Sequence, residues 1–244
     1  MKQRLDVAAL ERGLARSRAH ARALIDGGRV LVNGQALRRA ASTVHEDDAI
    51  TIAPGPDFVS RGGHKLDAAL GALAVSVDGA VCADVGASTG GFTDCLLRRG
   101  ARRVYAVDVG TAQLDPALSR DPRVTVMDGV NARALRATDF DEPLELVVVD
   151  ASFISLGALA AALAEVLPAG SELLALVKPQ FEVGRAAARR GRGVVRDSQA
   201  RERAIEGARL RLAEAGFELL GSCDSALAGP RGNLEHFLHA RRRG

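Results

Sequence analysis

The sequence predicts an α/β protein in which a small α+β domain precedes a doubly wound, mostly parallel sheet. From about residue 60 onward, short apolar runs typical of buried strands alternate with segments typical of helices. Several of these runs end at an acidic residue or a lysine. Ligands of doubly wound sheets bind at the carboxyl ends of the strands, so these residues indicate a functional edge. The expected domains are residues 1–56 and 60–244, with a linker at Pro54-Gly55-Pro56.

Bulk composition excludes several classes of protein. Of the 244 residues, 47% are hydrophobic, which suffices for a sizeable core. No apolar run reaches the roughly 18 residues that span a bilayer, so no membrane association is expected. The N-terminus lacks an apolar signal region, which argues against secretion. The three cysteines have no metal-ligand spacing, so we expect no metal, no disulfide framework and a cytoplasmic location.

The first 54 residues are expected to form two short helices followed by strands. The elements are a helix from Arg4-Leu5-Asp6 to Gly13, a helix from Ser17 to Gly27-Gly28, a strand Val30–Val32 with a turn at Asn33-Gly34, and a closing strand Ala49–Ile52. Ser17 is a suitable N-cap because its hydroxyl can accept from a free amide of the first turn. Asn-Gly between strand residues is a strong signal for a two-residue hairpin turn.

The same region carries most of the positive charge. Residues 1–45 hold nine Lys and Arg against three Asp and Glu, a net charge of +6. The other 199 residues hold 24 against 27, a net charge of −3. A basic module on a nearly neutral body indicates a polyanionic partner. The alternative is a solvated arginine-rich surface that binds nothing.

Beyond residue 60, charged residues follow several of the expected strands. The strands are Ala80–Ala83, Arg103–Val107, Val124–Met127, Leu144–Val149, Leu173–Val177, Phe217–Ser222 and Leu234–His239, and the helices run from Phe92 to about Arg99, over Leu156–Leu167 and over Ser198–Ala215. Asp108, Asp128, Asp150 and Lys178 each come directly after a strand. We therefore expect these side chains to meet at one edge of the sheet.

A glycine-rich turn after the first of these strands is the candidate cofactor site. Its residues and two later acids are Asp84, Gly86, Ser88, Thr89, Gly90, Gly91, Phe92, Asp108 and Asp128. Glycine lets the backbone approach a ligand, and the next helix presents free amides. The spacing Gly86-x-x-x-Gly90-Gly91 differs from the G-x-G-x-x-G of dinucleotide-binding enzymes. The pattern resembles the S-adenosylmethionine site of Rossmann-like methyltransferases. NAD binding, a purely structural turn and, for Asp128, the capping of a turn are the alternatives.

Two lysines and two acids form the candidate catalytic set. Lys65 precedes the sheet, Asp150 and Lys178 follow successive strands, and Glu235 is expected on the last strand. A lysine can accept a proton where burial or nearby positive charge lowers its pKa, and a carboxylate can orient the ammonium group. Structural ion pairs are the alternative. The order Lys-Asp-Lys-Glu resembles that of the FtsJ-like ribose 2′-O-methyltransferases.

Longer motifs carry a more specific resemblance. "SRGGHKLDAAL" (Ser60–Leu70), "DVGASTGGFTDCLL" (Asp84–Leu97), "VVVDASFISL" (Val147–Leu156), "LVKPQFEVGR" (Leu176–Arg185), "GVVRD" (Gly193–Asp197) and "GPRGNLEHFL" (Gly229–Leu238) resemble the TlyA family. These are cytidine 2′-O-methyltransferases of ribosomal RNA, once named haemolysins. The N-terminal "RLDVAALERGLARSRAHARALIDGGRVLVNGQ" is similar to the S-four-like RNA-binding domain. Together the resemblances cover nearly the whole chain and imply a Rossmann-like S-adenosylmethionine-dependent methyltransferase sheet behind a small RNA-binding domain.

The resemblance implies a role for each catalytic candidate. Lys178 would accept the proton of a ribose 2′-hydroxyl or directly organise its acceptor, and Lys65 would supply positive charge beside it. Asp150 would hold Lys178 and the target hydroxyl, and Glu235 would position the second lysine. Ribosomal RNA or a ribosomal subunit would be the partner, and the sequence gives no signal for an obligatory protein partner.

The resemblance also implies that Arg4, Arg12, Arg18 and Arg22 face RNA phosphates. Pairing of any one of them with Asp6, Glu11 or Asp26 is the alternative. Few aromatic residues occur in this region, so phosphate contact is expected rather than base stacking.

Two features near the expected sites depart from the family or are not assigned by it. Thr111-Ala112 stands where the family has a further glycine, and Met127–Asn131 differs from the usual Glu-Arg-Thr-Asn run. The segment Val183–Arg203 carries seven arginines and two acids, and we hypothesise that it closes over RNA. A solvated loop is the alternative.

For the whole chain, the competing functions are an NAD-dependent oxidoreductase, an inactive RNA-binding assembly factor and a membrane-active toxin.

Overall fold

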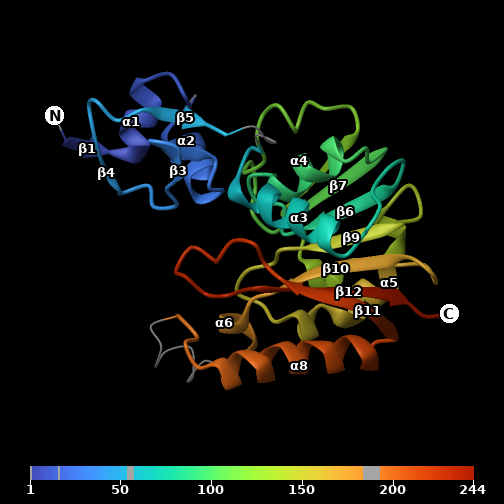
Figure 1. Ribbon diagram of the computed structural model, residues 1–244. Coiled ribbons are helices and arrows are strands. Elements are labelled where there is room, and N and C mark those ends of the chain that lie inside the picture. The colour runs from blue at the N-terminus through green and yellow to red at the C-terminus, as the bar shows by residue number, and fades with distance from the viewer. Residues whose placement is uncertain (1, 16, 54–57, 184–192) are drawn as a thin grey trace.

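The computed structural model describes residues 2–15, 17–53, 58–183 and 193–244, which form the two units seen in Figure 1. The expected linker Pro54-Gly55-Pro56 and Arg185, Arg189, Arg190 and Arg192 of the arginine-rich segment lie outside the described residues. The helices are α1 (Leu5–Glu11), α2 (Arg18–Asp26), α3 (Arg61–Ala72), α4 (Gly91–Arg98), α5 (Ala160–Val166), α6 (Pro179–Glu182) and α8 (Ser198–Glu214). The strands are β1 (Lys2–Arg4), β2 (Val30–Val32), β3 (Gln35–Ala36), β4 (Thr43–His45), β5 (Ile50–Ile52), β6 (Val81–Val85), β7 (Arg103–Asp108), β8 (Val124–Asp128), β9 (Leu146–Val149), β10 (Glu172–Val177), β11 (Phe217–Asp224) and β12 (His236–Arg242).

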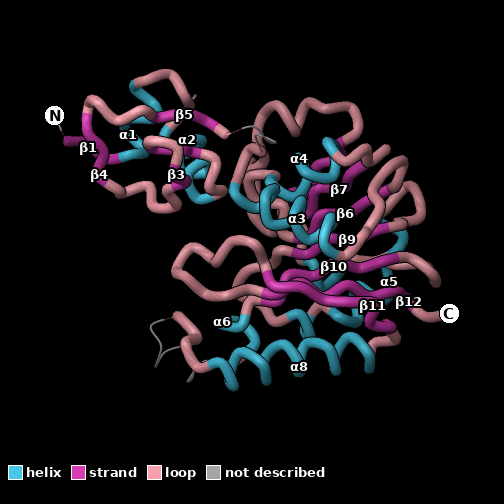
Figure 2. Tube along the Cα trace, in the orientation of Figure 1, coloured by secondary structure: helices cyan, strands magenta, loops and turns pink. Residues whose placement is uncertain are grey.

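The N-terminal unit (residues 2–53) packs α1 and α2 against two small sheets (Figure 2). The Ser17 hydroxyl accepts from the His20 amide at 3.1 Å, which confirms the predicted N-cap of α2. Asn33 and Gly34 both have positive φ angles, 51° and 81°, as the predicted hairpin turn between β2 and β3 requires. The apolar faces of both helices and the strands bury one small core.

A second, two-stranded sheet in this unit was not predicted. Strands β1 and β4 pair antiparallel, so that Gln3 lies opposite Val44. The sequence of β1 is Lys-Gln-Arg, which has no apolar residue and therefore no alternation that would indicate a strand. The pairing places Asp6, just inside α1, in the interior of the unit with no exposed surface.

The C-terminal unit (residues 58–244) is built on a mostly parallel sheet. Within the described residues it has seven strands in the order β11-β12-β10-β9-β6-β7-β8, of which only β12 runs antiparallel to the rest. The chain proceeds outward from β6 through β7 to β8, then returns to the other side of β6 for β9 and β10. The strand order thus reverses between β6 and β9, and ligands bind at such a switch point.

Helices cover both faces of this sheet, as Figure 1 shows. Alternate residues of each buried strand point to opposite faces. Val147 and Val149 of β9 pack with α5 and α8, whereas Leu146 and Val148 pack with α3 and α4. Because both faces are buried, the strands are continuous apolar runs, and this is why the sequence predicted them well.

Other elements differ from the expectation. The helix expected at Leu156–Leu167 is a 3₁₀ turn at Leu156–Ala158 followed by α5. Helix α3 was not predicted, because its first turn is Arg-Gly-Gly-His and glycine is a poor helix former. The last strand begins at His236, so Glu235 lies just before β12 and not on it. Leu234 is exposed because it precedes the strand.

Asp6 should be essential to the N-terminal unit, because its buried carboxylate accepts hydrogen bonds from three arginines. We expect Asp6→Asn to lower the unit's free energy of unfolding by about 2 to 3 kcal/mol, since a neutral amide replaces charged hydrogen bonds. Faster hydrogen exchange in residues 2–53, with residues 58–183 unchanged, would report this. Asp47→Asn, at an exposed acid of the same unit, removes the same charge and should have no effect. Equal exchange in the two variants would contradict the prediction.

Candidate functional site

Strand register brings three of the four catalytic candidates to one edge of the sheet. Val149 is the last residue of β9 and Val177 the last of β10, so Asp150 and Lys178 leave adjacent parallel strands. Val177 lies opposite His236 on antiparallel β12, which places Glu235 next to this edge. Three segments far apart in the chain therefore deliver an acid, a lysine and a second acid to the end of the sheet.

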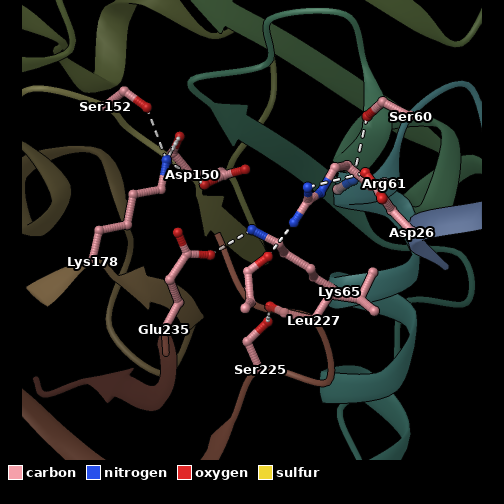
Figure 3. A network of polar contacts seen from close by, with 12 residues as sticks. Asp26, Ser60, Arg61, Lys65, Asp150, Ser152, Lys178, Ser225, Leu227 and Glu235 are labelled. Atoms are coloured by element: carbon pink, nitrogen blue, oxygen red, sulfur yellow. Dashed lines mark hydrogen bonds and ion pairs between the residues drawn. The ribbon is translucent and has the colours of Figure 1, made fainter. Parts of the chain in front are cut away.

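Lys178 is held tightly at the end of β10. Its Nζ lies 2.7 Å from Asp150 Oδ1 and donates to the Asp150 carbonyl at 3.1 Å and to the Ser152 hydroxyl at 2.9 Å. The side chain is only 10% exposed. Asp150 and Ser152 both belong to the turn after β9, so this one turn fixes the position of the ammonium group (Figure 3).

Lys65 and Glu235 form a second ion pair beside the first. The Nζ of Lys65 donates to Glu235 Oε2, and both side chains are almost completely buried. Lys65 comes from α3, one turn beyond its start, and Glu235 from the loop before β12. Figure 3 shows the two ion pairs pointing toward a common space. The structure thus brings together all four catalytic candidates.

That space is a cavity of 1160 Å³ whose walls carry both ion pairs. It is also lined by Gly86, Ser88, Thr89, Gly91 and Phe92 of the glycine-rich turn. A polar substrate group in this cavity would meet two ammonium groups and two carboxylates at once. Such an arrangement can orient a hydroxyl group and remove its proton.

The glycine-rich turn follows β6 closely. Gly86 has a φ of 92°, and a Cβ there would lie 2.9 Å from the Asp150 carbonyl oxygen. Only glycine fits both the left-handed backbone and the neighbouring turn. The turn continues through Ser88, also at positive φ, into α4, which begins at Gly91.

A second cavity, of 620 Å³, lies between this turn and the end of β7. Asp108 lines it and accepts from the Ser88 amide at 2.8 Å and from the Gly110 amide at 2.7 Å. Its carboxylate has further lone pairs that could receive ribose hydroxyls. Apolar side chains such as Val130 and Leu159 form other walls of the cavity. Apolar walls with a few polar groups suit a nucleoside, and the two cavities share Ser88 and Asp150.

The other two predicted cofactor acids lie elsewhere. Asp84 is inside β6 and fully buried, and it accepts a hydrogen bond from the Thr93 hydroxyl at 2.7 Å. This bond ties β6 to α4 on either side of the glycine-rich turn. Burial raises the pKa of Asp84 to about 7. Asp128 is exposed and accepts a hydrogen bond from the Ala112 amide at 2.8 Å. It therefore caps the turn at Ala112, which was the alternative role considered for it in place of cofactor binding. Asn131, which sequence reasoning passed over, lines the second cavity in its place.

Three of the four predicted RNA-binding arginines converge on Asp6. Arg4, Arg18 and Arg22 donate to its carboxylate over 2.9 to 3.2 Å, and each remains about half exposed. They hold the pKa of Asp6 well below its usual range, Arg4 above all. These three arginines therefore pair with an acid, as the alternative interpretation of the sequence had it. Their guanidinium groups also form a cluster that faces solvent. Arg12 instead donates to three carbonyls, at Asp48, His45 and Glu46.

The structure also identifies site residues that the sequence analysis did not single out. Ser152 binds Lys178, and Phe153 is 91% exposed with a φ of 65°, lining both cavities. The Phe153 and Phe181 rings lie 5.2 Å apart. Arg61, in the first turn of α3, lines the larger cavity. All four residues lie within the motifs quoted above, but only contacts and backbone angles distinguish them from their neighbours.

A doubly wound sheet, a glycine-rich turn with an acid at the end of the next strand and an adjoining cavity with two lysines define a Rossmann-like methyltransferase. The family model of the FtsJ-like methyltransferases matches residues 58–242, and that of the S4 domain matches residues 3–50. The chain belongs to the TlyA family of FtsJ-like methyltransferases. Solved methyltransferase structures at low identity share its fold. The predicted fold class is confirmed.

Individual relatives support this assignment. The chain is 44% identical over 240 residues to the 16S/23S rRNA (cytidine-2′-O)-methyltransferase TlyA of Mycobacterium tuberculosis, covering 98% of this chain and 89% of the relative. The solved structure of a "putative hemolysin" from Streptococcus thermophilus is 38% identical, with a TM-score of 0.76, and covers 99% of this chain and 89% of that one. Magnesium protoporphyrin IX methyltransferase of Synechocystis shares the fold at 18% identity, with a TM-score of 0.51, over 75% of this chain and 84% of that one.

In the part of the chain that the structure describes, no helix is both long and apolar enough to cross a membrane.

The buried carboxyl of Asp84 predicts a pH dependence of stability. Its folded-state pKa of about 7 is above the ordinary value of 3.8, so the folded protein retains a proton that the unfolded chain releases. We therefore expect wild type to lose stability relative to Asp84→Asn as pH rises from about 4 to about 7, by at most about 4 kcal/mol. Urea unfolding followed by circular dichroism on both sides of this window measures the difference. A difference that is constant with pH would contradict the prediction.

Proposed function

We propose that the protein methylates the 2′-hydroxyl of a cytidine in ribosomal RNA, with residues 1–56 as the RNA-binding domain and residues 60–244 as the catalytic domain. The observation that carries the proposal is the pair of buried lysine–carboxylate ion pairs in one cavity beside the glycine-rich turn. The name of the Mycobacterium tuberculosis relative, a 16S/23S rRNA (cytidine-2′-O)-methyltransferase, supports the substrate.

In this proposal the residues that line the 620 Å³ cavity would hold S-adenosylmethionine, which would supply an activated methyl group. Asp108 would accept hydrogen bonds from the ribose hydroxyls, and Val130 and Leu159 would form the apolar walls beside the adenine. The glycine-rich turn lets the donor approach the larger cavity, since Gly86 and Ser88 line both. Asp84 and Asp128 act indirectly, by supporting β6 and by capping the turn at Ala112.

The two ion pairs handle the proton of the target hydroxyl. Transfer forms a bond between the 2′-oxygen and the methyl carbon, breaks the bond between that carbon and sulfur, and releases the hydroxyl proton. Asp150 holds the hydroxyl and Lys178 together. The ammonium group of Lys178 first releases one proton to water, and the neutral amine then accepts the proton of the hydroxyl. Lys65 supplies positive charge that stabilises the developing oxyanion, and Glu235 fixes its position.

Phe153 offers a surface for the target base. A base within a folded RNA must leave its stack before its ribose can enter a cavity. The exposed ring of Phe153, supported by Phe181, lies where the two cavities meet and can stack on an extruded base. Its left-handed backbone conformation, unusual for an aromatic residue, directs the ring into solvent.

Lys178→Arg tests whether Lys178 accepts the proton. Arginine keeps the positive charge but does not lose its proton in proteins, so a proton acceptor cannot be replaced by it. We expect both Lys178→Ala and Lys178→Arg to lower methyl transfer from labelled S-adenosylmethionine to ribosomal RNA by at least about a hundredfold. Cofactor binding, measured by calorimetry, should change little.

The outcomes of this experiment separate the alternatives. Partial activity of Lys178→Arg alone would show that charge, not proton transfer, is what Lys178 provides. No transfer by wild type to RNA, subunits or ribosomes, with RNA still bound, would favour an inactive assembly factor. Leakage of dye from liposomes in place of methylation would favour the toxin.

The solvent-facing arginines around Asp6 should contribute to RNA affinity through phosphate contacts. We expect Arg18→Gln to weaken RNA binding and to reduce the slope of log K against log salt by about one, as one phosphate contact would. Arg209→Gln, which removes the same charge from α8, is the matched control and should leave the slope unchanged. An equal effect of both substitutions would mean that net charge, and not this cluster, attracts the RNA.

A further inference from the structure

We propose that Arg61 is a positioning residue through which the N-terminal unit controls the Lys65/Glu235 pair, with Asp26 as its partner. The inference rests on the proposed function, because it assumes that this pair takes part in methyl transfer. It concerns a contact between the two units that lies outside the linker and within the described residues.

The Arg61 guanidinium joins three segments of the chain. Its Nη1 lies 3.2 Å from Asp26 Oδ2, at the C-terminal end of α2 in the N-terminal unit. Its Nη2 donates to the carbonyl of Ala228, in the loop that leads to Glu235. Arg61 itself is in the first turn of α3, which carries Lys65. Figure 3 shows Arg61 beside Asp26. The side chains of Arg61 and Asp26 are each about three-quarters buried, so water screens their ion pair less than a surface pair.

Arg61 is rigidly connected to Lys65. The two residues are four apart in α3 and so lie on the same face, one turn from each other. The start of α3 has little freedom to shift, because it is packed closely against α4. A Cβ on Gly91 would lie 2.2 Å from the Ser60 hydroxyl oxygen, the N-cap of α3. The contacts of Arg61 therefore help to fix the position of Lys65.

Arg61 also acts on the loop before Glu235. This loop, residues 225–235, is closed by hydrogen bonds from the Ser225 amide to the Glu235 carbonyl and from the Gly229 amide to the Asn233 carbonyl. Ala228, which Arg61 binds, is next to Gly229. A Cβ on Gly229 would lie 2.4 Å from Glu235 Oε1, so the backbone at this point packs closely against the carboxylate and leaves no room for a side chain. Arg61 thus contacts both supports of the ion pair.

Helix α2 links this contact to the RNA-facing arginines. Arg18 and Arg22 lie in its first half, and Asp26 is its last residue. The helix spans only about 14 Å, so it moves as one rod. Its end docks on α3, where a Cβ on Gly27 would lie 3.1 Å from the His64 ring. RNA that engages Arg18 and Arg22 therefore sets the position of Asp26, and through Arg61 that of Lys65 and Glu235.

The test is Asp26→Asn in the full chain, with Asp67→Asn as the matched control. Asp67 is on α3 and pairs with Arg99 at 2.7 Å, at similar exposure, but it does not link the two units. We expect Asp26→Asn to lower kcat by about tenfold, as misplacement of a reacting group does, with KM for RNA and Kd for S-adenosylmethionine changed less than about twofold. Asp67→Asn should leave kcat within about twofold of wild type. Arg61→Gln should lower kcat similarly, and adding Asp26→Asn to it should cause no further loss.

Three results would overturn the proposal: an unchanged kcat in Asp26→Asn, the same loss in Asp67→Asn, or additive losses in the double variant. Hydrogen exchange supplies a second readout that does not depend on turnover. Exchange in residues 225–235 and in the first turn of α3 should be faster in Asp26→Asn than in Asp67→Asn, and equal exchange would refute the contact's role. If wild type transfers no methyl group to any RNA, the proposed function fails, while this comparison still decides whether Asp26 positions the pair.

Discussion

The site depends on the burial of two ammonium groups in one cavity. An unpaired buried charge is strongly destabilising, and breaking a buried pair costs about 3 to 5 kcal/mol. Lys65 and Lys178 must therefore each have a carboxylate, and the fold supplies Glu235 and Asp150. The sheet order meets this requirement, because β9, β10 and β12 are neighbours. The antiparallel return of β12 is what allows an acid from the C-terminal region to reach the same edge as Asp150.

The two cavities are built in different ways. The 620 Å³ cavity is lined largely by one stretch of chain, from Val85 to Arg133, with the turn after β9 and Leu159 completing it. The larger cavity takes its charged groups from α3, from two strand ends, from α6 and from the loop before β12. Their meeting point is the topological switch between β6 and β9, where the backbone of Gly86 touches that of Asp150.

Sequence alone predicted the fold well and selected four charged residues that the structure brings together, for physical reasons. Strands buried on both faces are continuous apolar runs, and a charged residue directly after such a run marks a strand end. On this basis the sequence correctly placed Asp150, Lys178 and the glycine-rich turn at the ends of strands. It was misleading at Asp84, which looks like a strand end but lies one residue before it, inside β6. Strand ends predicted from sequence differ from the observed ones by a residue or two. For a buried acid, that difference decides whether the side chain lines a cavity or lies inside the sheet behind it.

The remaining features depend on contacts between distant segments, which local patterns do not show. Nothing in the residues around Asp6 indicates that three arginines share it, since two of them come from the next helix. The exposure of Phe153 follows from one backbone angle. The contact of Arg61 with Ala228 spans 167 positions in the sequence. Such long-range pairings are properties of the assembled fold.

The separation of Lys65 and Glu235 by 170 positions also has a consequence for folding. Contacts between residues far apart in the sequence form late, because the entropy of closing a long loop must be overcome first. Most of the lining of the 620 Å³ cavity comes from residues 85–133 and includes no residue of the C-terminal loop that carries Glu235. Under the proposed function, donor binding therefore requires only the central part of the fold, whereas activity also requires the pairing of Lys65 with Glu235.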